Sequence, residues 1–80
     1  MPLFFDPPRV HFDGHCELQD ASALWQFLRA TPAAEVDLEC CEGMHAALFQ
    51  VLAVLRPRIV APPIDPRLGS LIEQVTGSAP

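Results

Sequence analysis

The sequence predicts one small α/β domain, in which a mainly parallel four-stranded sheet forms a single layer and three helices lie mostly on one of its faces. Segments that alternate apolar and polar residues, as strands do, take turns along the chain with segments of helical periodicity. Proline and glycine punctuate the boundaries between these segments. Strands separated by helices need crossover connections, which join parallel strands. The 80 residues allow one domain, with a core at about residues 9–76 and termini that are expected to be flexible.

The first strands are expected near the N-terminus. Residues 3–5 are apolar and precede an Asp-Pro-Pro turn signal at residues 6–8, so they are expected to form a short strand. In the following segment, residues 9–16, Val10 and Phe12 alternate with polar residues. This period of two predicts a strand that buries Val10 and Phe12 on one face.

A helix and a central strand follow. Asp20 or Ser22 can cap a helix at about residues 20–30, and Pro32 stops it. The apolar residues of this helix share one stripe: Ala21, Leu24, Trp25, Phe27 and Leu28. The alternation at residues 35–40 predicts a strand with Val36, Leu38 and Cys40 on one side and Asp37, Glu39 and Cys41 on the other.

The second half of the chain predicts a helix, a strand and a helix. Residues 45–55 are apolar nearly all round, which indicates the most buried helix, and residues 58–61 form a short strand between prolines. Asp65 and Pro66 begin the last helix, and Gly77 is expected to end it. The predicted core includes Leu24, Leu28, Leu38, Leu52, Leu71 and Ile72.

Charge and hydropathy exclude several classes of protein. The formal net charge is −5 with only five basic residues, whereas a nucleic-acid binder needs clustered Lys and Arg. The longest apolar run, residues 44–55, would span about 18 Å as a helix, which is too short to cross a hydrocarbon core of about 30 Å. The N-terminal residues are not expected to form a signal peptide, and three cysteines, an odd number, argue against a disulfide framework. We therefore expect a cytoplasmic protein that binds no nucleic acid and inserts in no membrane.

One face of the predicted sheet is polar. His11, Asp13, Asp37 and Glu39 would gather there if the two central strands are neighbours. Such a group could supply general acids and bases. Charged neighbours in water more often form a solvated sheet face, however, and no glycine-rich loop accompanies these residues. The polar face is therefore expected to be open to water or to pack against another subunit, as in a homodimer.

The segments VHFDGHCELQDASALWQFLRA and EVDLECCEGMHAALFQVLAVL combine a strand that ends in Gly14, a polar start of the first helix at Asp20 and a central strand containing Val-Asp-Leu. A loop of about six residues is expected to lead into the second helix. In these features the chain resembles the STAS family of anti-sigma-factor antagonists and related domains of sulphate transporters, over roughly residues 9–76. The resemblance implies a non-catalytic, cofactor-free interaction module that docks on a kinase, an anti-sigma factor or a similar regulator.

The resemblance also implies where docking takes place. Partners of STAS domains contact the loop and first turn of the second helix, which in this chain are Glu42, Gly43, Met44, His45 and Ala46. Family members carry a phosphorylatable serine there, but Ala46 takes its place and His45 stands where the family has Asp. Residues 32–69 contain neither Ser nor Thr. The docking surface is therefore expected to work without a phosphorylation switch.

The alternative hypothesis is a small metal-binding or thiol redox protein. Cys40, Cys41 and His45 offer thiolate and imidazole ligands of the kind that zinc takes, and Cys41 precedes a helix N-terminus that can lower a thiol pKa. Their spacing matches no strong zinc pattern, and adjacent cysteines on a strand point to opposite faces. The competing interpretation makes Cys40 a small core residue and Cys41 a loop residue.

Overall fold

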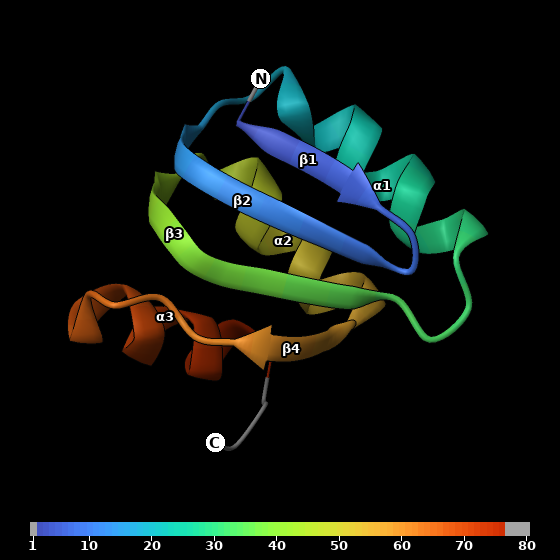
Figure 1. The fold of residues 1–80 in the computed structure, drawn as a ribbon. Helices are drawn as coiled ribbons and strands as arrows, with labels where there is room; N and C mark the ends of the chain where they lie inside the picture. Colours follow the sequence, from blue (N-terminus) through green and yellow to red (C-terminus); the bar gives the residue numbers. More distant parts are fainter. Residues whose placement is uncertain (1, 77–80) are drawn as a thin grey trace.

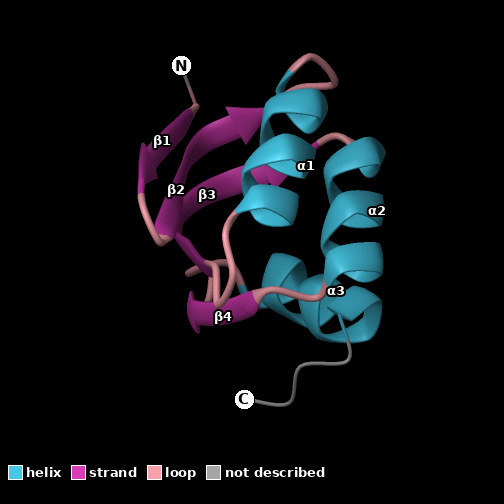
Figure 2. Cartoon of the chain, turned by 90° about the vertical axis from the view of Figure 1, so that its right-hand side faces the viewer, coloured by secondary structure: helices cyan, strands magenta, loops and turns pink. Residues whose placement is uncertain are grey.

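A four-stranded sheet carries three helices on one of its sides (Figure 1, Figure 2). The structure is a computed structural model in which residues 2–76 are described. The elements are β1 (Leu3–Asp6), β2 (Arg9–Cys16), α1 (Asp20–Ala30), β3 (Glu35–Met44), α2 (Ala46–Leu55), β4 (Arg58–Ala61) and α3 (Pro66–Thr76). The predicted small α/β fold with four strands and three helices is confirmed. The predicted end of the last helix at Gly77 lies outside the described residues.

The sheet is mixed, so the prediction of a mainly parallel sheet is wrong. Its strand order is β1-β2-β3-β4, in which β1 pairs antiparallel with β2, while β2, β3 and β4 run parallel to one another. The reason lies in the connection between β1 and β2. Only Pro7 and Pro8 separate these strands, and so short a link can make a hairpin but not the crossover that parallel strands require.

The core lies between the sheet and the helices. Val10, Phe12, Val36 and Leu38 are at most 1 % exposed and belong to one buried cluster with Leu24 and Leu28 of α1 and Leu48 and Leu52 of α2. The predicted core residues Leu24, Leu28, Leu38, Leu52 and Ile72 are buried.

Leu71 was predicted to be in the core, and that prediction is wrong because its side chain is 48 % exposed. α3 packs against α2 beside the β4 edge of the sheet. It therefore buries only a narrow stripe, which Leu68 and Ile72 fill. Residue 71 is turned about 100° away from residue 72 around the helix axis.

An irregularity in β3 reverses the predicted sides of the adjacent cysteines. Between the pairs His11–Asp37 and Asp13–Cys40, β3 advances three residues while β2 advances two. This extra residue is a β-bulge, which breaks the alternation of side chains. Cys40, expected in the core, is exposed, and Cys41, expected in a loop, is 4 % exposed.

β3 also runs further than predicted. It continues to Met44, which pairs with Cys16 of β2, and the register shifts by one more residue between the pairs Gly14–Cys41 and His15–Gly43. The six-residue loop expected before the second helix is therefore absent from this part of the described chain. His45 alone links β3 to α2 as the N-cap residue.

The predicted N-cap residue is confirmed for α3 and wrong for α1. Asp65 caps α3 as predicted, because its Oδ1 accepts a hydrogen bond of 2.9 Å from the backbone N–H of Arg67. α1 begins at Asp20, so Gln19 occupies the N-cap position and neither predicted cap is used. The buried Asp20 carboxylate instead accepts a hydrogen bond of 2.8 Å from the backbone N–H of Glu17. That bond orders the β2–α1 connection.

Candidate interaction site

The predicted docking residues lie where β3 passes directly into α2. Glu42, His45 and Ala46 are exposed, whereas Gly43 and Met44 are half-buried. Met44 packs against the hydrophobic core. The segment therefore presents polar and small side chains to solvent from a backbone that belongs to the sheet and to the helix.

Three contacts order this junction. The backbone N–H of His45 donates to the carbonyl of Cys16 over 2.8 Å. His45 Nδ1 accepts a hydrogen bond of 3.0 Å from the backbone N–H of Ala47, which satisfies one of the free donors at the start of α2. The imidazole of His15 lies against Gly43, so close that a Cβ on residue 43 would come within 2.8 Å of the ring. A pre-ordered surface of this kind loses less conformational entropy when a partner binds.

Two buried thiols lie beneath the junction, on the core side of β2 and β3. Cys16 is 1 % exposed and Cys41 is 4 % exposed. A hydrogen bond with Cys41, together with burial, raises the pKa of the Cys16 thiol. The same hydrogen bond lowers the pKa of Cys41, against the effect of burial. Cys41 Sγ also donates to the carbonyl of Gly43 at 3.5 Å. Cys41 therefore interacts with Cys16, a residue that sequence reasoning did not place beside it.

The structure does not assemble the metal site of the alternative hypothesis. Cys40 points to solvent and Cys41 into the core, while His45 Nδ1 is engaged by the helix cap. Within residues 2–76, no three His, Cys, Asp or Glu side chains converge in a way that could hold a metal ion.

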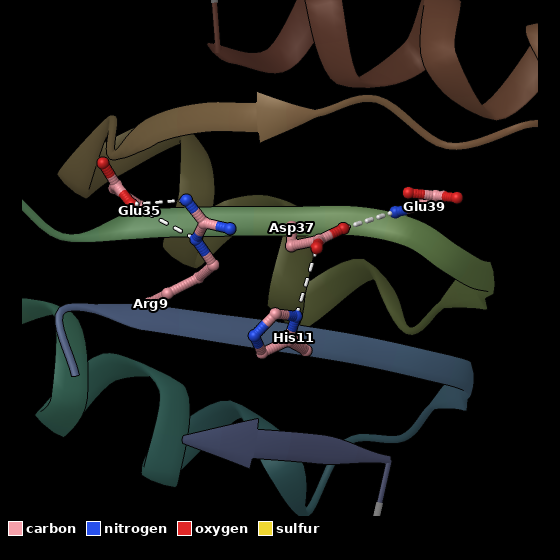
Figure 3. Close-up of polar contacts among 5 residues, drawn as sticks. All are labelled: Arg9, His11, Glu35, Asp37 and Glu39. Carbon is pink, nitrogen blue, oxygen red and sulfur yellow. Dashed lines mark hydrogen bonds and ion pairs between the residues drawn. The ribbon is translucent and has the colours of Figure 1, made fainter. Parts of the chain in front are cut away.

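The polar face predicted for the sheet is present, and Figure 3 shows His11, Asp37 and Glu39 on the side of the sheet away from α1 and α2. His11 Nδ1 donates to the Asp37 carboxylate oxygen Oδ2 over 3.1 Å, and the two side chains point toward each other in Figure 3. The other carboxylate oxygen of Asp37 accepts a hydrogen bond of 3.0 Å from the backbone N–H of Glu39. Both oxygens of Asp37 are thus used to fix β2, β3 and the bulge, which favours a structural role for this carboxylate.

An ion pair that sequence reasoning missed extends the same face. Arg9 donates from Nε and Nη2 to Glu35 Oε1 over 3.2 and 3.0 Å. Both residues are the first of their predicted strands, and only the pairing of Arg9 with Glu35 in the sheet brings them together. An ion pair that remains accessible to solvent, as this half-buried one does, contributes about 0–1 kcal/mol to stability. It helps to set the register rather than to form a site.

A depression on this face holds about 230 Å³ and is lined by Phe4, His11, Phe12, Asp13, Asp37, Glu39 and Cys40. This volume is below the roughly 300–1,000 Å³ of pockets that bind small molecules. The four predicted polar residues His11, Asp13, Asp37 and Glu39 therefore do line one surface. Its size and the engaged Asp37 give little support to an active site.

A larger groove adjoins this depression further along β3, and the two share Glu39 and Cys40 as lining residues. It holds about 510 Å³ and is lined by His15, Glu39, Cys40, Cys41, Glu42, Ile64 and Asp65. Ile64 and Asp65 come from the β4–α3 connection, and their part in the groove was not predicted. The two prolines before Ile64 were a signal that the chain leaves the sheet there.

Comparison with known protein families, with curated proteins and with solved structures finds no match. The resemblance to the STAS family stays a prediction from the sequence. Among the described residues, no helix is both long enough and apolar enough to cross a membrane.

Proposed function

We propose that this chain is a non-catalytic, STAS-like protein-interaction module that docks a regulatory protein, such as a kinase or an anti-sigma factor, through the β3–α2 junction. The docking residues are Glu42, Gly43, Met44, His45 and Ala46. As part of this proposal the module acts in the cytoplasm, a reducing compartment that suits its three free cysteines.

The observation that supports the proposal most is that the start of α2 is both exposed and held in a fixed conformation. Its start is exposed at Ala46 and capped by His45, whereas Leu48, Val51 and Leu52 are buried further along the helix. Glu42, His45 and Ala46 therefore offer an exposed surface at the start of the helix, although Gln50 and Val54 are also exposed further along it. The hydrogen bond from His45 to Cys16 holds that surface in place before binding.

The proposal includes constitutive docking, because the position that carries the phosphorylated serine in STAS proteins is Ala46. A phosphoserine adds about 1.5–2 negative charges at a docking surface. Ala46→Asp introduces one negative charge at the same position. The first turn of a helix favours an anion, so this variant should fold normally.

For the test, the immobilised wild-type chain is used to isolate a partner from cell lysate. That partner is then titrated against the wild-type chain and each variant. Ala46→Asp should bind that partner at least tenfold more weakly, which corresponds to about 1.4 kcal/mol. His45→Ala should have a smaller effect, because it removes a hydrogen-bonding side chain but adds no charge. Gln50→Glu is the matched control, since it adds one negative charge to the exposed side of the same helix and should bind within about twofold of wild type.

Unchanged binding by folded Ala46→Asp would contradict docking at the junction. If reversal of the charges at Asp37 and Glu39 abolished binding in the same assay, the docking surface would be the polar face of the sheet. Light scattering on the isolated chain then decides whether that face forms a homodimer.

A further inference from the structure

The outer edge of β3 is only partly covered by β4. β4 pairs with Glu35, Val36 and Asp37 alone, although β3 continues to Met44. Figure 1 shows the second half of β3 extending past β4. Within residues 2–76, no strand pairs with the outer edge of residues 40–44.

The sequence explains why β4 stops short. Pro62 and Pro63 follow it directly, and proline has no N–H to donate to a neighbouring strand. The chain turns away from β3 and reaches α3 through Ile64 and Asp65. Backbone N–H and C=O groups on a strand edge that no neighbouring strand covers can pair with another chain.

The groove of about 510 Å³ lies between this edge and the β4–α3 connection. Its lining is acidic, with Glu39 and Glu42 both exposed and in no ion pair that the described residues form. Asp65 is a weaker contributor because Arg67 lies 3.8 Å from it. Ile64 adds an apolar side chain that is 81 % exposed. Among residues 2–76, no Arg lines the groove.

We propose that this edge binds an extended, basic peptide segment of the partner as an added strand beside residues 40–44. Main-chain hydrogen bonds to β3 would supply affinity, and Arg or Lys side chains facing Glu39 and Glu42 would supply selectivity. A second copy of this chain fits less well, since strand-to-strand pairing would bring the glutamates of both copies together. The proposal rests on the protein-interaction function proposed above and adds the chemistry of the bound segment.

The probes are three capped eight-residue peptides. One alternates Val and Arg, the second alternates Val and Glu, and the third is the Val-Arg peptide with its two central valines replaced by proline. Each is titrated into the isotope-labelled full chain while backbone amide shifts are recorded. The Val-Arg peptide should bind at least tenfold more tightly than the other two, with the largest shifts at residues 40–44.

Charge variants of the chain test the groove itself. Glu42→Lys should weaken binding of the Val-Arg peptide at least fivefold. Asp6→Lys makes the same change of charge on an exposed residue of β1, at the opposite edge of the sheet, and should bind within about twofold of wild type. Both substitutions are at exposed positions, so the amide spectrum can verify that each variant is folded.

Several outcomes overturn the proposal. Equal binding of the Val-Arg and Val-Glu peptides contradicts charge selection, and full binding of the proline peptide contradicts strand addition. Shifts centred on the polar face at His11 and Asp37 place the peptide elsewhere. If the Val-Arg peptide does not bind at the edge but Ala46→Asp still weakens docking of the partner, strand addition is wrong and docking at the junction stands. If the peptide binds at the edge but Ala46→Asp leaves docking unchanged, docking at the junction is wrong.

Discussion

Because Cys16 and Cys41 form a buried thiol pair, we predict that the free energy of unfolding falls at alkaline pH. The chain contains no Tyr and no Lys, so the cysteines are the only side chains with ordinary pKa values between about 8 and 11. The hydrogen bond with Cys41 and burial raise the pKa of Cys16. Folded protein therefore retains a proton that the unfolded chain releases above about pH 8.5. A group whose pKa is higher in the folded state than in the unfolded state stabilises the fold. Its contribution is complete below the unfolded-state pKa and is lost as the pH rises above it.

Ionisation of the two thiols changes the free energy of unfolding in opposite directions, and the two effects occur in different pH ranges. The pKa of Cys41 is lowered, so its ionised form adds stability that is complete once the pH exceeds the unfolded pKa. Above about pH 9.5 the Cys41 contribution is constant while that of Cys16 still declines. One retained proton corresponds to a loss of about 1.4 kcal/mol per pH unit.

The assay is urea unfolding followed by Trp25 fluorescence between pH 7 and 10.5. We expect the free energy of unfolding to fall steadily above about pH 9, and Cys16→Ala to have a lower stability at pH 7 but a much smaller fall. Cys40→Ser is the control, since Cys40 is exposed and its removal should leave the alkaline slope unchanged. A wild-type stability that is flat from pH 9 to 10.5 would refute the raised pKa of Cys16.

Further predictions concern the core and the reactivity of the thiols. Leu52 is fully buried in α2, so Leu52→Ala should lower the free energy of unfolding by about 2–5 kcal/mol. Val54→Ala, at a position 66 % exposed on the same helix, should cost under about 1 kcal/mol, and equal urea midpoints for the two variants would contradict the placement of α2. A disulfide reagent at neutral pH should label one thiol per folded chain quickly, at Cys40, and the other two only upon unfolding. Rapid labelling of Cys41 instead would contradict the bulge in β3.

Local patterns in the sequence predicted much of the fold. The alternation at Val10 and Phe12, the stripe around Leu24 and Leu28, and the Asp65 cap are each set by neighbouring residues in the chain. All three predictions are confirmed.

The features that were missed depend on contacts between distant segments. The exchange of sides between Cys40 and Cys41 follows from the mismatch between β2 and β3, which neither strand shows alone. The extension of β3 to Met44 likewise depends on pairing with Cys16. The exposure of Leu71 reflects the position of α3 at the end of the helical layer.

The candidate site was predicted as a set of residues but not as a structure. The segment from Glu42 to Ala46 joins β3 to α2, and Glu42, His45 and Ala46 in it are exposed. That it is a strand end pinned to Cys16, rather than a loop, required the register of β2 and β3. The groove beside it required the turn after β4, where the prolines were visible in the sequence but the uncovered edge was not.

Side-chain footprinting of the partner complex by hydroxyl radicals would test the proposed docking surface most directly. Met44 and His45 report on the junction, whereas Phe4 and His11 report on the polar face of the sheet. The proposal predicts that partner binding slows oxidation of Met44 and His45 at least severalfold and leaves Phe4 and His11 at their free rates. Protection of Phe4 and His11, with Met44 and His45 unchanged, would contradict docking through the β3–α2 junction.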